Sequence, residues 1–135
     1  MHRLVGPKVV RARYEHIRAF EANLADAGTR VVKLDLHISQ EEQRERLQSR
    51  LDDPAKHWKF ELGDLAERRL WQDYQRAFRD AIAATTTPAA PWYVIPADRK
   101  WYRDWAILTV LTETLAAMDP RYPPAPEDLA GVVVV

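Results

Sequence analysis

A cluster of basic residues surrounds one short segment of the chain, 52–64, with the sequence DDPAKHWKFELGD. Arginine binds phosphate oxygens through two parallel hydrogen bonds, and lysine supplies a compact positive charge. Such a cluster on a mobile segment between two helices could close over a polyanion. The six cations that flank or occupy the segment are Arg46, Arg50, Lys56, Lys59, Arg68 and Arg69.

The same cations have acidic neighbours, and this allows a second interpretation. Charged helix faces are common, and exposed ion pairs contribute little to stability. The cluster would then be a solvated surface on which opposite charges pair with one another. The pattern alone favours this simpler interpretation. The acidic neighbours are Glu41, Glu42, Glu45, Asp52 and Asp53.

The sequence does not support several other kinds of site. Ser39 precedes Glu42 by three residues, which is the spacing of a helix-capping box, and this role explains the serine without catalysis. No glycine-rich phosphate-binding loop of the form G-x-x-x-x-G-K-[ST] is present. The histidines are far apart and have no acidic partner at metal-ligand spacing: His2, His16, His37 and His57.

Composition limits the type of partner. The 20 Lys and Arg residues equal the 20 Asp and Glu residues, so bulk charge argues against a general DNA, RNA or membrane binder. No apolar run approaches the length that spans a bilayer, and the first residues are too charged for a secretory signal. The absence of cysteine suits a reducing compartment, and we expect the protein to be cytoplasmic.

Hydrophobic periodicity predicts an α/β chain with two short strands. The segment VVKLDLHIS alternates apolar and polar residues, which indicates a strand, and the capped helix after it is typical of an α/β unit. Pro7 and Gly28 mark the ends of a first helix, and Asp98 is expected to cap the last one. We predict helices at 7–27, 40–51 and 64–84, a loop at 52–63, strands at 32–38 and 92–96, and a last helix beyond residue 98.

The tryptophans differ in their expected roles. Trp71, Trp101 and Trp105 recur on helical apolar stripes, so we expect them in the core. Trp58 lies between two lysines in the predicted loop, with no stripe to join. We expect it to anchor this loop on the neighbouring helices rather than to contact a ligand.

Three stretches closely resemble the polyphosphate kinase 2 family. They read LHISQEEQRERLQSRLDDPAKHWKFELGDLAERRLWQDYQRAF, PWYVIPADRKWYRDWAILTVLTETL and RYEHIRAFE. The resemblance covers residues 4–122, and the ordered run of Pro54, Lys56, Trp58, Lys59 and Asp64 is its most specific part.

The resemblance implies the C-terminal part of a P-loop kinase-like fold with three layers, similar to thymidylate kinase. It also implies phosphoryl transfer between inorganic polyphosphate and a nucleoside mono- or diphosphate, with Mg²⁺. Residues 1–122 would form a partial domain whose lid spans 46–69, followed by a flexible tail at 123–135. The positions that match the basic lid residues, and would bind polyphosphate or nucleotide phosphates, are Arg46, Arg50, Lys56 and Lys59.

The chain also departs from the family pattern. The phosphate-binding loop, the acidic residue after it and a second basic motif are missing, so the Mg²⁺ ligands are expected outside this chain. Arg99 stands where the family usually carries an acid. We therefore expect a truncated phosphotransferase that is inactive alone. Two alternatives stay open: a non-catalytic partner, which completes a separately encoded P-loop half or binds polyphosphate without turning it over, and a helical module without any phosphate role. The expected macromolecular partners are a missing N-terminal half or further copies of the chain in a homo-oligomer.

Overall fold

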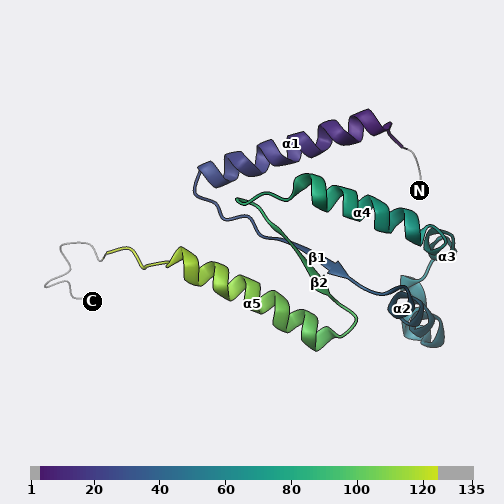
Figure 1. Ribbon diagram of the computed structural model, residues 1–135. Helices are drawn as coiled ribbons and strands as arrows, with labels where there is room; N and C mark the ends of the chain where they lie inside the picture. Colours follow the sequence, from purple (N-terminus) through teal and green to yellow (C-terminus); the bar gives the residue numbers. More distant parts are fainter. Residues whose placement is uncertain (1–3, 125–135) are drawn as a thin grey trace, which may run out of the picture.

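The computed structural model describes residues 4–124, and within this range helices alternate with two short strands (Figure 1). The predicted tail at 123–135 lies, from residue 125 on, outside the described residues. None of the described helices is both long and apolar enough to cross a bilayer. The elements are α1 Pro7–Asp26, β1 Lys33–His37, α2 Gln40–Asp52, the 3-10 helix η1 Pro54–Lys59, α3 Leu62–Arg68, α4 Trp71–Thr85, β2 Trp92–Pro96 and α5 Lys100–Met118.

The two strands pair in parallel, as an α/β unit requires. Lys33 is opposite Trp92 at one end of the pair, and His37 is opposite Pro96 at the other. Helices α1 and α4 lie side by side on one face of the strands, and α5 packs against β2 on the opposite face (Figure 1). The chain therefore builds three layers, helix, sheet and helix, around a narrow sheet.

The amino ends of the strands carry a buried polar network. The Lys33 Nζ lies 2.7 Å from the Glu21 Oε2 and donates a hydrogen bond of 2.7 Å to the carbonyl oxygen of Thr85. The same ammonium group sits 5.3 Å from the centre of the Trp92 ring. The Trp92 indole N–H donates to the Thr85 hydroxyl at 2.9 Å. This network ties α1, β1, α4 and β2 together.

Most predicted elements are confirmed, but the segment after α2 differs. The expected loop at 52–63 contains η1, which Asp53 caps by accepting a hydrogen bond from the Ala55 N–H at 3.0 Å. The expected helix at 64–84 is two helices that meet at Arg69 and Leu70. No proline or glycine marks this break. It follows from tertiary contacts, because Arg68 binds the start of α2 while Trp71 and later residues turn toward β1.

The expected core tryptophans are the clearest correction. Trp101 is 69% exposed and lines an open groove beside the end of β2, and Trp105 is 57% exposed. Trp71 is half-buried beside β1. Among the described residues, the buried apolar side chains are those of Ala90, Ile95 and Ala97. A two-stranded sheet covers only one face of each neighbouring helix, so large side chains on the other faces stay open to solvent.

Candidate functional site

The basic hairpin formed by α2, η1 and α3 lies where both parallel strands end. Helix α2 begins three residues after β1, and the Ser39 hydroxyl caps it by accepting a hydrogen bond from the Glu42 N–H at 3.0 Å. In open α/β sheets, ligands bind outside the carboxyl ends of the strands. The hairpin therefore occupies the edge of the sheet where such a fold places its ligand.

Asp98 joins the two strand ends rather than capping α5. Its carboxylate accepts a hydrogen bond of 2.7 Å from the Ser39 N–H, whereas the N-cap of α5 is Arg99, which makes no capping hydrogen bond. The bond from Ser39 is the largest cause that holds the pKa of Asp98 below its usual value, and the charges of Arg46 and His37 act in the same direction. The expected cap is wrong because the carboxylate turns toward the start of α2.

Arg46 is engaged by protein groups. Its Nε lies 2.7 Å from the Glu42 carboxylate, and its Nη2 donates a hydrogen bond of 2.9 Å to the carbonyl oxygen of Ala97, just beyond β2. The side chain is 34% exposed. Arg46 thus fixes the base of the hairpin to the sheet, and the pairing with a nearby acid fits the simpler interpretation of its charge.

Arg50 and Lys56 bind within the hairpin itself. The Arg50 Nη1 donates to the carbonyl oxygen of Lys59 at 3.2 Å and lies 3.9 Å from an oxygen of Asp64, so it closes the hairpin. The Lys56 Nζ lies 2.8 Å from the Asp53 carboxylate, and this contact is the main cause that lowers the pKa of Asp53. Both cations remain partly open to solvent, with 38% of Arg50 and 49% of Lys56 exposed.

Trp58 does not anchor the hairpin. It is 78% exposed, and the Lys59 Nζ lies 4.8 Å from the centre of its ring. The expectation failed because η1 contacts α2 through His57, whose ring nitrogen lies 2.9 Å from the Leu51 carbonyl oxygen, and the indole therefore points outward. Lys56, Trp58 and Lys59 together form an exposed basic and aromatic tip.

Arg68 belongs to the framework of the hairpin. It donates hydrogen bonds of 2.7 Å to the carbonyl oxygen of Gln40 and 2.8 Å to the side chain of Gln43, which holds α3 against α2. Arg69 lies at the turn between α3 and α4. The six predicted cations thus separate into residues that hold the hairpin and residues that remain accessible at its tip.

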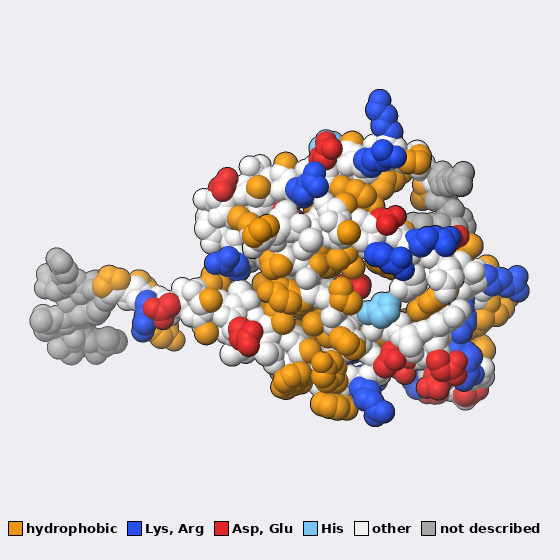
Figure 2. Space-filling view, viewed as in Figure 1, with side chains coloured by type: hydrophobic (Ala, Val, Ile, Leu, Met, Phe, Trp, Pro, Cys, Tyr) orange, Lys and Arg blue, Asp and Glu red, His pale blue; other side chains and the backbone are white. Residues whose placement is uncertain are grey.

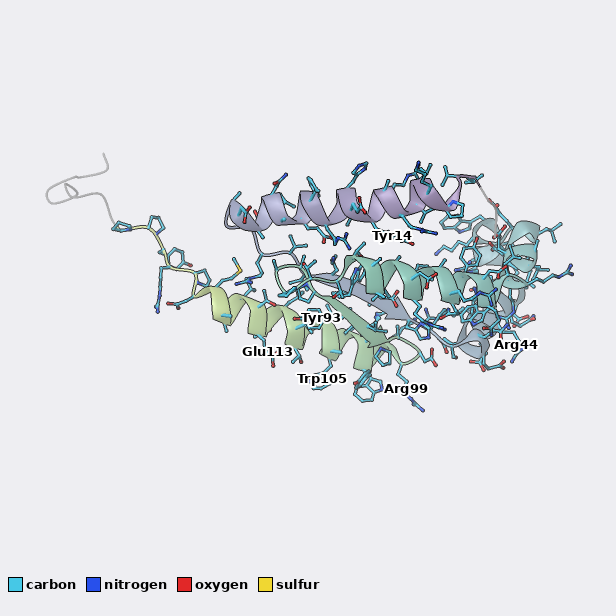
Figure 3. The ribbon with its side chains drawn as sticks, turned by 45° about the horizontal axis from the view of Figure 1, so that its top comes forward. Tyr14, Arg44, Tyr93, Arg99, Trp105 and Glu113 are labelled. Atoms are coloured by element: carbon cyan, nitrogen blue, oxygen red, sulfur yellow. The ribbon has the colours of Figure 1, made fainter. Side chains whose placement is uncertain are left out.

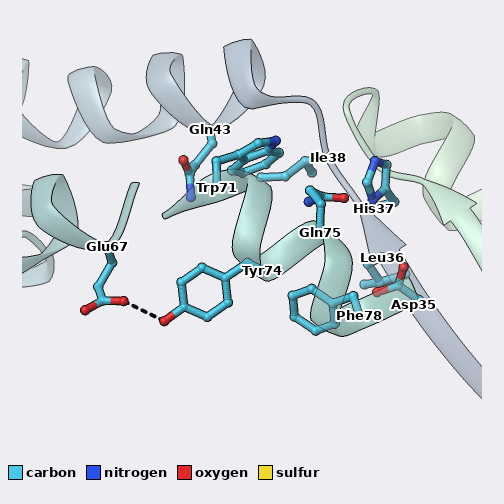
Figure 4. Close-up of a pocket in the computed structure, with 10 residues that line it drawn as sticks. All are labelled: Asp35, Leu36, His37, Ile38, Gln43, Glu67, Trp71, Tyr74, Gln75 and Phe78. Atoms are coloured by element: carbon cyan, nitrogen blue, oxygen red, sulfur yellow. Dashed lines mark hydrogen bonds between the residues drawn. The ribbon is translucent and has the colours of Figure 1, made fainter. Parts of the chain in front are cut away.

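A groove of about 320 Å³ opens between β1 and α4, beside the hairpin. Trp71, Tyr74 and Phe78 project into it from successive turns of α4 (Figure 4). The Tyr74 hydroxyl donates a hydrogen bond of 2.5 Å to Glu67, and this bond is the largest cause that raises the pKa of Tyr74. A second groove of about 390 Å³ lies on the other face of the strands, and His37 lines both.

The hairpin presents two exposed cations at its tip, Lys56 and Lys59. Within residues 4–124, no three His, Cys, Asp or Glu side chains gather in a way that could hold a metal ion. The sequence interpretation missed the link between Asp98 and Ser39. Both residues follow the ends of parallel strands, which meet at one edge of a sheet, so their positions in the chain could have revealed it.

Comparison with known proteins identifies the family. The sequence pattern of the family described as Polyphosphate kinase 2 (PPK2) matches residues 1–123. An AMP/ADP-polyphosphate phosphotransferase of Meiothermus ruber is 52% identical over 98% of this chain and 49% of its own length. An ADP-polyphosphate phosphotransferase of Rhodopseudomonas palustris is 41% identical over 82% of this chain and 38% of its own.

A solved structure shows the same arrangement of elements. The crystal structure of polyphosphate kinase 2 from Arthrobacter aurescens superimposes with a TM-score of 0.87 and 44% identity, over 92% of this chain and 44% of the solved one. The chain therefore has the fold of one part of a P-loop kinase-like α/β protein, and it spans about half the length of these relatives. The chain belongs to the polyphosphate kinase 2 family.

Proposed function

We propose that this chain supplies the lid of a polyphosphate:nucleotide phosphotransferase, which moves a phosphoryl group between inorganic polyphosphate and a nucleoside mono- or diphosphate. The observation that carries the proposal is the position of the basic hairpin at the carboxyl ends of both strands, with Arg46 bonded to Ala97 just beyond β2. Relatives named for AMP/ADP and ADP favour an adenosine nucleotide as the second substrate.

The lid residues have distinct roles in this proposal. Phosphoryl transfer depends on positioning and on stabilising negative charge rather than on covalent chemistry by the protein. Lys56 and Lys59, exposed at the tip, bind phosphate oxygens directly. Arg50 keeps the hairpin closed while its exposed part reaches the same phosphates. Arg46 contributes charge and holds the lid in register with the sheet.

The chain alone supplies only part of the reaction. Members of this family generally depend on Mg²⁺, and among residues 4–124 no group of His, Asp or Glu side chains could hold the ion. We infer that the isolated chain binds polyphosphate without turning it over. We also propose that the protein is located in the cytoplasm, as expected from the sequence.

A second candidate is a non-catalytic module that works only with a completing polypeptide. It is favoured by the small core, because Ala90, Ile95 and Ala97 are the buried apolar residues among those described. The free edge of β1 and the groove beside α4 would accept such a polypeptide. The two candidates share polyphosphate binding at the lid and differ in whether any assembly containing this chain transfers phosphate.

Binding and turnover can be measured on the same protein. Polyphosphate is titrated into the 135-residue chain while Trp fluorescence is recorded, since Trp58 lies beside the proposed contacts. The variant Lys56→Ala/Lys59→Ala should bind at least about tenfold more weakly. The slope of log affinity against log salt concentration should become less negative by about 1.4. This value is by analogy with the loss of two phosphate contacts to a single-stranded nucleic acid. The matched control Lys8→Ala/Arg79→Ala removes two exposed cations on α1 and α4 and should bind like the parent.

A phosphotransfer assay with polyphosphate, Mg²⁺ and ADP or AMP completes the test. Binding without turnover supports a lid that needs the rest of the protein. Turnover by the chain alone that is lost on changing Lys56 and Lys59 would overturn the claim of inactivity. Equal polyphosphate binding by both double variants would overturn the role of the lid and leave a helical module without a phosphate role.

A further inference from the structure

The groove at the start of α5, of about 390 Å³, lies outside the lid and combines apolar walls with a free cation. Its apolar lining comes from β2 and from the first turn of α5, through Val94, Pro96, Trp101 and Tyr102. Figure 2 shows apolar side chains gathered along the lower edge of the molecule, where α5 lies, with a basic side chain beside them. Small-molecule sites commonly enclose about 300–1,000 Å³. This chain alone therefore builds a groove of the size of a ligand site.

Trp101 forms an open aromatic surface in this groove. It is 69% exposed, and its ring meets the Tyr102 ring edge to face, with centroids 5.7 Å apart and an interplanar angle of 89°. The Tyr102 ring also lies 5.5 Å from the ring of Trp105. These contacts support the indole and leave most of it open to solvent. Exposed aromatic rings stack on nucleic-acid bases, because every base has a π-face. Polyphosphate has no such group, so the groove favours a ligand with a planar ring.

Arg99 supplies a cation that has no partner in the protein. Within residues 4–124, its guanidinium group makes neither an ion pair nor a hydrogen bond. Its side chain extends away from the sheet at the start of α5 (Figure 3). The arginines of the hairpin differ, because Arg46, Arg50 and Arg68 all donate to protein oxygens. Arg99 is therefore available to an anion.

The acidic residue beside Arg99 does not cancel this charge. Asp98 also lines the groove, but its carboxylate accepts the hydrogen bond of 2.7 Å from the Ser39 N–H and faces the charge of Arg46. No acidic residue occupies the first turn of α5. A guanidinium group binds phosphate oxygens through two parallel hydrogen bonds. The groove thus offers a phosphate contact beside a surface for a planar ring.

We propose that this groove binds a nucleotide, with the base stacked on Trp101 and a phosphate held by Arg99. The groove also reaches His37 and Ser39, so a nucleotide in it lies at the same edge of the sheet as the start of α2. The choice of an adenosine nucleotide rests on the proposed function. The site itself uses none of the four lid cations.

Equilibrium dialysis of the 135-residue chain against ADP, and separately against adenosine, measures this binding. Trp101→Ala should weaken the binding of both ligands at least about fivefold, because the stacking surface is lost. Arg99→Ala should weaken ADP binding at least about fivefold, toward the affinity of adenosine, because a charge-assisted phosphate contact is lost. Its affinity for adenosine should stay that of the parent, since adenosine has no phosphate.

Two variants serve as matched controls. Trp105→Ala removes an exposed tryptophan of the same helix that is not part of the groove lining. Arg79→Ala removes an exposed arginine of α4. Both should bind ADP like the parent. Far-UV circular dichroism verifies that each variant keeps its helices.

The lid variant Lys56→Ala/Lys59→Ala distinguishes the groove from the lid. It should lose polyphosphate affinity and keep ADP affinity. Equal ADP binding by the parent, Trp101→Ala and Arg99→Ala would overturn the groove and leave the lid proposal intact, as would a parent chain that shows no saturable ADP binding. Loss of ADP binding in the lid variant alone would assign the nucleotide phosphates to the lid and also overturn the groove. ADP binding that is lost only in the groove variants, together with unchanged polyphosphate binding in the lid variant, would support the groove and overturn the lid.

Discussion

The two ends of the strand pair are built in opposite ways. At the amino ends, the side chains of Lys33 and Glu21 are only 11% and 10% exposed, and their charges are paired within the protein. At the carboxyl ends, Lys56 is 49% exposed and Trp58 is 78% exposed. A charge that is buried needs its partner in order for the chain to fold, whereas an exposed charge remains available to a ligand.

At the carboxyl end, the contacts of the basic hairpin change from its base to its tip. Arg46 and Asp98 bond the base of α2 to residues beyond β2, and the tip beyond Arg50 binds mainly within the hairpin. The proposed lid role requires this combination, because the base of a lid stays in register with the sheet while its tip is accessible to a ligand. The comparison predicts that substitutions at the amino end change stability, those at the base change stability modestly, and those at the tip change binding alone.

The largest effect is expected from Lys33→Met. The substitution leaves the Glu21 carboxylate buried without its partner, which typically costs about 3–5 kcal/mol of unfolding free energy. Urea unfolding followed by Trp fluorescence measures the change. The double variant Glu21→Leu/Lys33→Met removes both charges and should recover much of the loss. A single variant as stable as the parent would show that the network does not hold the amino ends together.

The local elements could be predicted from the sequence, but their exposure could not. The alternation in VVKLDLHIS predicted β1, and the Ser39–Glu42 spacing predicted the cap that the structure confirms at 3.0 Å. These features depend on neighbouring residues only. The break at Leu70 and the exposure of Trp101 depend on what packs against each face, which periodicity does not contain. The residue types and spacing predicted the basic cluster, and its role in binding phosphates stays a prediction. The bond between Arg46 and Ala97 joins residues 51 positions apart, and local patterns do not contain it.

An intermediate effect is expected at the base of the lid. Arg46→Ala removes the hydrogen bond to the Ala97 carbonyl oxygen, and we expect a loss of about 1 kcal/mol in unfolding free energy. Lys59→Ala at the tip should leave unfolding free energy within about 0.5 kcal/mol of the parent, since exposed substitutions of this kind rarely do more. Urea unfolding of both variants beside a polyphosphate titration separates the two roles. Equal stability of the two variants would contradict the graded lid.

The smallest effect concerns the pH dependence of the link between the strand ends. The pKa of Asp98 is lower in the folded chain than the usual value of about 3.9, because its carboxylate accepts the Ser39 N–H and faces the charges of Arg46 and His37. Its stabilising contribution is therefore present above pH 4 and is lost as the pH falls through the lowered pKa.

Asp98→Asn keeps an oxygen acceptor but removes the charge, so the variant should be less stable than the parent at pH 7. The difference between their urea midpoints should shrink toward pH 3. Because Glu41 and Asp53 titrate in both proteins, taking this difference isolates Asp98. A difference that stays constant with pH would mean that the hydrogen bond, and not the charge, carries the link.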